Sequence, residues 1–257
     1  MSWTALTGFL LLTGVAAYAQ TLTGFAFGLI TMGGVGLTGL LSLPDAAMLV
    51  SVLTLVNACQ MLLKGWRDVA WRTFGLVTLA SLPCLVLGYE LLIWLADSRA
   101  DVLRVALGLT IIVSSLQLAR KPQPLQRESG RFGFLFFGGV AGLMGGMFST
   151  SGPPLVYHLY RQPLALATIR ETLVTIFALN ATVRTGMVAV SGQVPSASTL
   201  TGLIAVPVVM MATHLARRYP PPLSQRAMRQ IVFALLFLSG VALGAPALIH
   251  LTAQFGR

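Results

Sequence analysis

Apolar stretches long enough to cross a membrane follow one another along almost the whole chain. A spanning helix needs about 20 apolar residues, and stretches of that length run from Trp3 to Ile249 with only short polar breaks. The pattern predicts single helices over residues 45–63, 69–94, 101–119, 164–190, 197–215 and 227–249. Two further stretches, residues 3–43 and 132–160, are rich in glycine. We therefore expect an all-α polytopic membrane protein.

Composition agrees with this pattern and excludes a soluble domain. Apolar residues make up 56% of the chain and charged residues 9%, against roughly 25% charged residues in soluble domains, and the mean hydropathy is +0.82. Both cysteines, Cys59 and Cys84, lie inside apolar stretches, which argues against a disulfide framework. Because the N-terminus lacks the features of a secretory signal peptide, we expect the first apolar stretch to belong to the mature fold.

The two halves of the chain look like duplicates. Glycine, asparagine and proline markers recur in the same order: residues 24–34 align with residues 142–152 at a constant offset, Asn57-Ala58 with Asn180-Ala181, and residues 79–83 with residues 203–207. Between the halves lies the one clearly hydrophilic loop. We expect residues 1–120 to form a first transmembrane repeat, residues 121–131 a cytoplasmic linker, and residues 132–257 a second repeat.

The distribution of basic residues predicts the topology. Eight simple crossings would divide the 17 basic residues eight to nine between the two sides of the membrane. If residues 132–160 instead enter and return to the same side, the division becomes 13 to 4, a strong positive-inside pattern. By the repeat, residues 3–43 should also form a hairpin. Each half then holds a broken-helix hairpin plus three transmembrane helices, and the odd number of crossings inverts one half relative to the other.

The formal charge of +10 does not indicate nucleic-acid binding. A nucleic-acid surface needs basic residues clustered with aromatic or polar partners, whereas here they flank apolar segments. We expect the lipid bilayer to be a partner and nucleic acid not to be one.

Inverted repeats with broken helices are typical of transporters, and irregular backbone at membrane depth is tolerated only where it is buried or lines a wet cavity. The sequence predicts breaks at residues 32–36 and 149–154. In the second break, Ser151 or Gly152 can cap a helix whose first turn holds Pro153, where the missing N–H costs nothing. A short half-helix should then run to about Tyr160.

The second break carries a family resemblance. The stretch GGVAGLMGGMFSTSGPP over residues 138–154, its weaker partner over residues 24–36, and the following helix with Arg170 and Asn180 resemble the sulfite exporter TauE/SafE family. The resemblance covers nearly the whole chain. It implies export of sulfite or of small organosulfur and organic anions across a bacterial inner membrane. This chain has Ser151-Gly152-Pro153 where the family usually has three glycines, which affects the substrate more than the fold.

The two breaks are the first candidate binding site, near the membrane midplane. Backbone N–H groups at the start of a half-helix carry partial positive charge and bind small oxyanions. The substrate-binding candidates at the breaks are Gly33, Gly34, Ser149, Thr150, Ser151 and Gly152. Small residues also allow close helix packing in membranes, and this is the interpretation favoured for Gly24, Gly28, Gly138, Gly142 and Gly146.

Polar side chains inside apolar helices extend the candidate site. Asn57 and Asn180 could donate to an oxyanion or could hydrogen-bond a neighbouring helix, and for Gln20 and Gln60 the structural interpretation is favoured. Intramembrane charge is costly and therefore informative. Arg184 could guide an anion at the outer mouth or could anchor the outer surface.

Three further ionisable residues have structural alternatives. Arg170 and Glu171 are immediate neighbours, which are not expected to face each other on a helix, and both could reach the interface. His158 follows the second break and could serve proton coupling because histidine titrates near neutrality, although a packed or interfacial histidine is the favoured interpretation.

Other chemistry is not indicated. The chain has no Walker-type loop, CxxC pair or HExxH motif, so we expect no cofactor and no metal. An intramembrane serine protease would need a base beside Ser151, and the sequence places none there. An anion channel of the same fold remains an alternative. We expect a secondary transporter for small anions; a coupling ion, for which a proton and sodium are the candidates, and the oligomeric state are left open.

Overall fold

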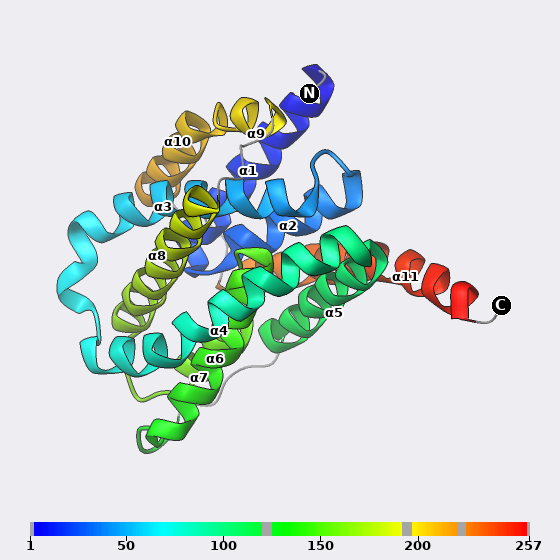
Figure 1. Ribbon diagram of the computed structural model, residues 1–257. Helices are drawn as coiled ribbons and strands as arrows, with labels where there is room; N and C mark the ends of the chain where they lie inside the picture. Colours follow the sequence, from blue (N-terminus) through cyan, green and yellow to red (C-terminus); the bar gives the residue numbers. More distant parts are fainter. Residues whose placement is uncertain (1–2, 120–124, 192–196, 220–224, 256–257) are drawn as a thin grey trace.

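The computed structural model describes residues 3–119, 125–191, 197–219 and 225–255, and all secondary structure in these ranges is helical (Figure 1). The first half contains α1 (Trp3–Thr23), α2 (Ala26–Thr38), α3 (Leu43–Gly65), the 3₁₀ turn η1 (Trp66–Asp68), α4 (Trp71–Ser98) and α5 (Ala100–Ala119). The second half contains α6 (Arg131–Phe148), α7 (Pro153–Tyr160), α8 (Leu166–Val190), α9 (Ala197–Gly202), α10 (Ala205–Arg218) and α11 (Gln225–Phe255).

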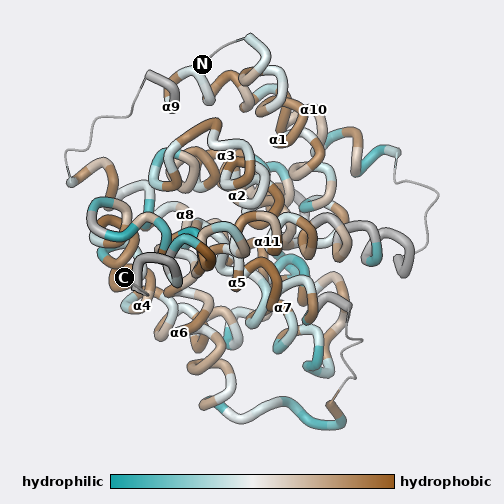
Figure 2. Tube along the Cα trace, turned by 90° about the vertical axis from the view of Figure 1, so that its right-hand side faces the viewer, coloured by the Kyte–Doolittle hydropathy of each residue, from teal (hydrophilic) through white to brown (hydrophobic). Residues whose placement is uncertain are grey.

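Seven segments of the described chain are helical, long and apolar enough to cross a membrane. In lipid every backbone N–H and C=O must be satisfied within the protein, which the α-helix achieves locally. Large apolar side chains such as Leu11, Leu79 and Val190 are exposed on the outside, and apolar segments reach the periphery of the chain trace (Figure 2). The prediction of an all-α polytopic membrane protein is confirmed.

The six predicted single helices are all present, with one interruption. The helix expected over residues 197–215 is divided into α9 and α10, because residues 203–204 form a turn. Part of the predicted linker, residues 121–124, lies outside the described residues.

Each of the two glycine-rich stretches forms a pair of helices, α1 with α2 and α6 with α7. The second break occurs where it was predicted: α7 begins at Pro153 with Gly152 as its N-cap residue, and ends at Tyr160. Ser149 ends α6 in the left-handed conformation at φ 53°, and its N–H donates to the Gly145 carbonyl at 2.9 Å.

The predicted first break is wrong. Gly33 and Gly34 lie inside α2, and the chain instead breaks at Gly24 and Phe25. Gly24 has φ 87°, a conformation that glycine adopts without strain, and its N–H donates to the Gln20 carbonyl at 2.6 Å. In membrane proteins, glycines inside a helix allow neighbouring helices to pack closely, and this packing offsets the low helix propensity of glycine.

The corrected break changes the register of the repeat. Gly24 now corresponds to Ser149, 125 positions later, whereas the glycine alignment used a constant offset of 118. The new offset agrees with the separations of Asn57 from Asn180 and of Pro83 from Pro207, which are 123 and 124. The glycine alignment is therefore out of register with the helix breaks.

Glycines bring the backbones of α4 and α6 close together. Three glycines at four-residue spacing, Gly138, Gly142 and Gly146, face the carbonyl groups of Val77, Ser81 and Leu85. A Cβ atom added to Gly138 would lie 2.6 Å from the Val77 oxygen, so no larger side chain fits. The favoured packing interpretation of these glycines agrees with this geometry.

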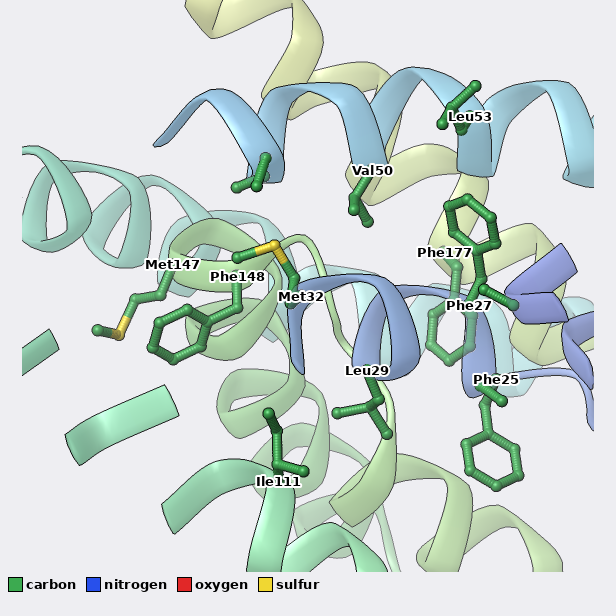
Figure 3. Close-up of a cluster of buried hydrophobic side chains, with 14 of the residues drawn as sticks. Phe25, Phe27, Leu29, Met32, Val50, Leu53, Ile111, Met147, Phe148 and Phe177 are labelled. Atoms are coloured by element: carbon green, nitrogen blue, oxygen red, sulfur yellow. The ribbon is translucent and has the colours of Figure 1, made fainter. Parts of the chain in front are cut away.

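Helix α2 lies at the centre of the molecule (Figure 1). Its side chains Phe27, Leu29 and Met32 are fully buried and belong to one apolar cluster that also includes Leu53 of α3 and Phe148 of α6. Figure 3 shows the side chains of α2 gathered with those of the surrounding helices. This packing fixes the first break beside the second.

Candidate functional site

A cavity lies where the second break meets α3 and α8. Its lining includes six of the residues predicted from the sequence, namely Ser149, Thr150, Ser151, Gly152, Asn180 and Arg184. The remaining lining residues are Gln20, Phe25, Gly28, Ser51, Thr54, Gly145, Phe177 and Ala181. The wall is thus polar around the second break and on α3, and aromatic at Phe25 and Phe177.

Arg184 is the largest fully buried side chain among the described residues and is only 1% exposed. Its Nε donates to the Gly146 carbonyl at 2.9 Å, and its Nη1 donates to Ser51 Oγ at 3.4 Å. The guanidinium carbon lies 5.6 Å from the centre of the Tyr89 ring. Arg184 is therefore part of the cavity wall and not an anchor on the outer surface, and its role in guiding an anion stays a prediction.

The guanidinium of Arg184 has no carboxylate partner in the described part of the chain. The described ion pairs join Arg72 to Glu128, Arg104 to Asp101 and Arg170 to Glu171. No acidic residue lines the cavity. Burying a charge without a partner is costly, so the cavity favours an anion as an occupant.

Hydroxyl and amide groups of the second break are held in place by neighbouring helices. Asn180 Oδ1 accepts from Ser81 Oγ, and Asn180 Nδ2 donates to Ser151 Oγ, both at 3.0 Å. Ser149 Oγ donates to the Ala47 carbonyl at 2.5 Å and lies 2.7 Å from Ser51 Oγ. The cavity wall is thereby fixed before any ligand enters.

Thr150 differs from its neighbours because its hydroxyl is unsatisfied. The residue is 4% exposed and lines the cavity, yet its Oγ1 has no hydrogen-bond partner among the described residues. A buried hydroxyl without a partner costs free energy. A ligand in the cavity could supply the missing partner.

The N-terminus of α7 offers fewer backbone donors than the sequence interpretation assumed. Pro153 and Pro154 bring no N–H groups, and the Val156 N–H donates to the Gly152 carbonyl at 2.8 Å. Leu155 is the remaining amide of the first turn. A full charge from Arg184, and not the half-helix dipole alone, therefore dominates the electrostatics of the cavity.

Gly33, Gly34 and Asn57 lie away from the cavity. Gly33 packs beside Ile111 and Ser239, and Gly34 packs against Leu12. Asn57 is fully buried and its Nδ2 donates to Thr213 Oγ1 at 2.7 Å and to Thr21 Oγ1 at 3.3 Å. The structure thus gives these residues helix-packing contacts, which were the alternative interpretations.

His158 is also outside the cavity lining. Its ring stacks on Phe137 with centroids 4.4 Å apart and meets the edge of Phe134 at 5.0 Å. Gln162 Nε2 lies 3.5 Å from His158 Nε2. The geometry is that of a packed histidine, and its role in proton coupling stays a prediction.

The expectation that Arg170 and Glu171 would not interact is wrong. Arg170 Nη2 lies 3.0 Å from Glu171 Oε1, so the two side chains form an ion pair although they are adjacent in the sequence. Glu171 is 4% exposed, so its side chain is buried within the protein.

Sequence reasoning missed Ser51 and Thr54 of α3. Both are small polar residues three positions apart, which places them on one face of a helix, and that spacing was the available signal. Gln20 was assigned a structural role, which it has: its Oε1 accepts from the Phe27 N–H at 2.9 Å. It also lines the cavity.

Comparison with known proteins identifies the family. A family model described as "Sulfite exporter TauE/SafE" matches residues 9–243. The chain is 39% identical over 243 residues to the "Probable sulfite/organosulfonate exporter TauE" of Cupriavidus necator, with 95% of each chain covered. It is 30% identical over 187 residues to the "Probable inner membrane transporter protein TsaS" of Comamonas testosteroni, covering 70% of this chain and 74% of the relative. No solved structure matches the chain significantly. Because the family match spans nearly the whole sequence, this chain belongs to the sulfite exporter TauE/SafE family.

Proposed function

We propose that this protein is a secondary transporter that exports small anions, such as sulfite or organosulfonates, across the bacterial inner membrane. The printed names of its relatives support this class of function. The observation that carries the proposal is the buried guanidinium of Arg184, which lines a cavity and forms no ion pair with any described acidic residue.

The cavity suits an anion because it offers a cation and hydroxyl groups without a carboxylate. The charge of Arg184 attracts the ligand, and the Thr150 hydroxyl and the Ser151 and Asn180 side chains lie along the same wall. Hydrogen bonds to charged groups are stronger than those between neutral groups. Phe25 and Phe177 supply an apolar wall on which the carbon chain of an organic anion can pack.

Alternating access follows if the two halves are inverted repeats. If α1, α2, α4 and α5 are matched with α6, α7, α10 and α11, the helix contacts of one half recur in the other. The contact of α1 with α10 matches that of α6 with α4, and the contact of α2 with α11 matches that of α7 with α5. Two further contacts, α3 with α8 and α5 with α11, each join a helix to its counterpart in the other half. This pattern supports a pseudo-twofold axis through α3, α8 and the cavity, and with it a binding site near the midplane.

The contacts at one end of the molecule support the proposed orientation. Arg72 pairs with Glu128 at 3.8 Å, the Leu125 N–H donates to the Arg161 carbonyl at 2.7 Å, and Arg217 Nη1 donates to the Gln60 carbonyl at 2.6 Å. These contacts gather the α3–α4 turn, the linker, the α7–α8 loop and the end of α10. This basic end faces the cytoplasm in the proposal.

Thiol labelling tests the orientation. After replacement of Cys59 and Cys84, single cysteines at Arg127, Arg218 and Gln193 are probed with an impermeant reagent in intact cells. Only position 193, which lies outside the described residues, should label. Labelling at position 127 would contradict the hairpin topology.

Ligand-induced stabilisation tests the binding function. A ligand that binds only the folded protein raises its melting temperature by mass action. Sulfite, sulfoacetate, sulfate and chloride are compared on the purified protein in detergent, with Arg184→Gln as the matched variant. We expect at least one sulfur oxyanion to stabilise the native protein and to lose its effect on the variant. No shift with any anion would contradict the proposed site.

A further inference from the structure

The charge of Arg184 has no counter-ion among the residues that the structure describes. All seven acidic residues lie within the described part of the chain, and each is engaged or exposed elsewhere. Asp68, Glu90, Asp97 and Glu128 are exposed, Asp101 pairs with Arg104, Asp45 binds Ser42 and Thr199, and Glu171 pairs with Arg170. The cavity lining also contains no histidine.

The groups that do contact the guanidinium are neutral. They are the Gly146 carbonyl and the Ser51 hydroxyl, with the Tyr89 ring beside them. Neutral acceptors orient a cation but leave its charge uncompensated. Nothing in the lining can bind or release a proton to balance it, so compensation at this site has to come from a mobile anion.

We propose that the protein is an obligatory anion exchanger, which crosses between its two access states only with an anion beside Arg184. The inference rests on the proposed function. Passing from one access state to the other closes the cavity, and closing it empty would leave the buried guanidinium with neither an anion nor solvent in the cavity beside it at membrane depth, which is costly. A bound anion supplies the missing charge in both directions. Export of one anion is thereby coupled to entry of another.

Exchange and net uptake can be separated in proteoliposomes. Vesicles are loaded with unlabelled sulfite or with gluconate, a larger anion, and potassium with valinomycin is present on both sides so that charge movement is not limiting. Uptake of external radiolabelled sulfite is then timed. We expect uptake to be faster in the sulfite-loaded vesicles on the order of a hundredfold, the penalty of an unpaired arginine in the membrane. Equal rates would overturn the exchange inference and leave the proposed transport function standing.

Two variants assign the requirement to Arg184. Arg184→Met removes the charge, so its residual uptake should be the same in both kinds of vesicle. Arg184→Lys keeps the charge and should keep the dependence on internal sulfite, even with weakened binding. A dependence on internal sulfite that survives in Arg184→Met, or that disappears in Arg184→Lys, would overturn the inference. Absence of both uptake and anion-induced stabilisation in the native protein would overturn the proposed function together with it.

Discussion

The two helix breaks share a backbone design but differ in chemistry. Each ends a helix with a residue at positive φ, Gly24 at 87° and Ser149 at 53°. The N–H group of each donates a hydrogen bond to the carbonyl four residues earlier. The first break continues into Phe25 and Phe27, which are 7% and 0% exposed. The second continues into Thr150 and Ser151. A helix break is therefore a structural feature that both halves share. Only the second break carries hydroxyl side chains, which make it a candidate site.

The helices that follow show the same divergence. Helix α3 carries Asn57 with Met61 four residues later, and α8 carries Asn180 with Arg184 at the same spacing. Asn57 ties α3 to Thr21 and Thr213, and Met61 belongs to a small apolar cluster. Asn180 and Arg184 line the cavity. In our proposal the second half supplies the charged and amide groups that bind the anion, and the first half supplies part of the cavity wall.

The largest effect should come from removing the charge of Arg184, which stands where the first half has Met61. We expect Arg184→Met to weaken anion binding by about 2–3 kcal/mol, roughly 30- to 150-fold in Kd, because hydrogen bonds to charged groups contribute this much. Calorimetric titration with sulfite measures the Kd. Met61→Leu is the matched control, since a volume-conserving exchange in the cluster should leave the Kd unchanged. Equal losses in both variants would remove the distinction between the halves.

The paired asparagines should separate binding from stability. Asn180→Ala removes a donor that positions Ser151 in the cavity wall, and should cost about 1–2 kcal/mol of anion binding. Asn57→Ala breaks the contacts to Thr21 and Thr213, and should lower the melting temperature while the Kd stays within error. Titration and thermal unfolding of both variants decide the matter. A weakened Kd in Asn57→Ala would restore the original prediction that both amides bind the anion.

The breaks should differ in their tolerance of side chains. Gly24→Ala places a Cβ at φ 87° and 3.1 Å from Arg170 Cγ, which should destabilise the fold by about 1–2 kcal/mol. Ser149→Gly relieves the positive φ but loses the contacts to Ala47 and Ser51, so a smaller net change is expected. Thermal unfolding in detergent measures both. Greater stability of Gly24→Ala than of the native protein would show that the left-handed backbone is not needed there.

The smallest effect concerns the unsatisfied hydroxyl. Thr150→Val is nearly isosteric and removes a buried Oγ1 that has no partner among the described residues. We expect the empty protein to be as stable as the native one or slightly more so, and sulfite binding to weaken by about 0.5–1.5 kcal/mol. Opposite signs in melting temperature and affinity are the distinguishing result. A clear loss of stability would mean that the hydroxyl has a protein partner.

The sequence by itself determined the helices and the second break. In lipid a helix satisfies its own backbone, so apolar length alone predicts where spanning segments lie. Gly152 followed by two prolines is a strong local signal, since proline is favoured in the first turn of a helix and disfavoured in its interior. The same local reasoning failed at Gly33 and Gly34, because glycines that pack against another helix look the same in sequence as glycines that break one.

Only the tertiary structure decided which polar residues share the cavity. Asn57 and Asn180 are each followed by alanine in the sequence, yet Asn57 joins neighbouring helices and Asn180 lines the cavity. Which way a helix face points depends on how neighbouring helices pack against it, and that information is distributed over the whole chain. The depth of Arg184 was missed for this reason: its position along α8 was readable, but its burial beside Ser51 and Gly146 depends on α3 and α6.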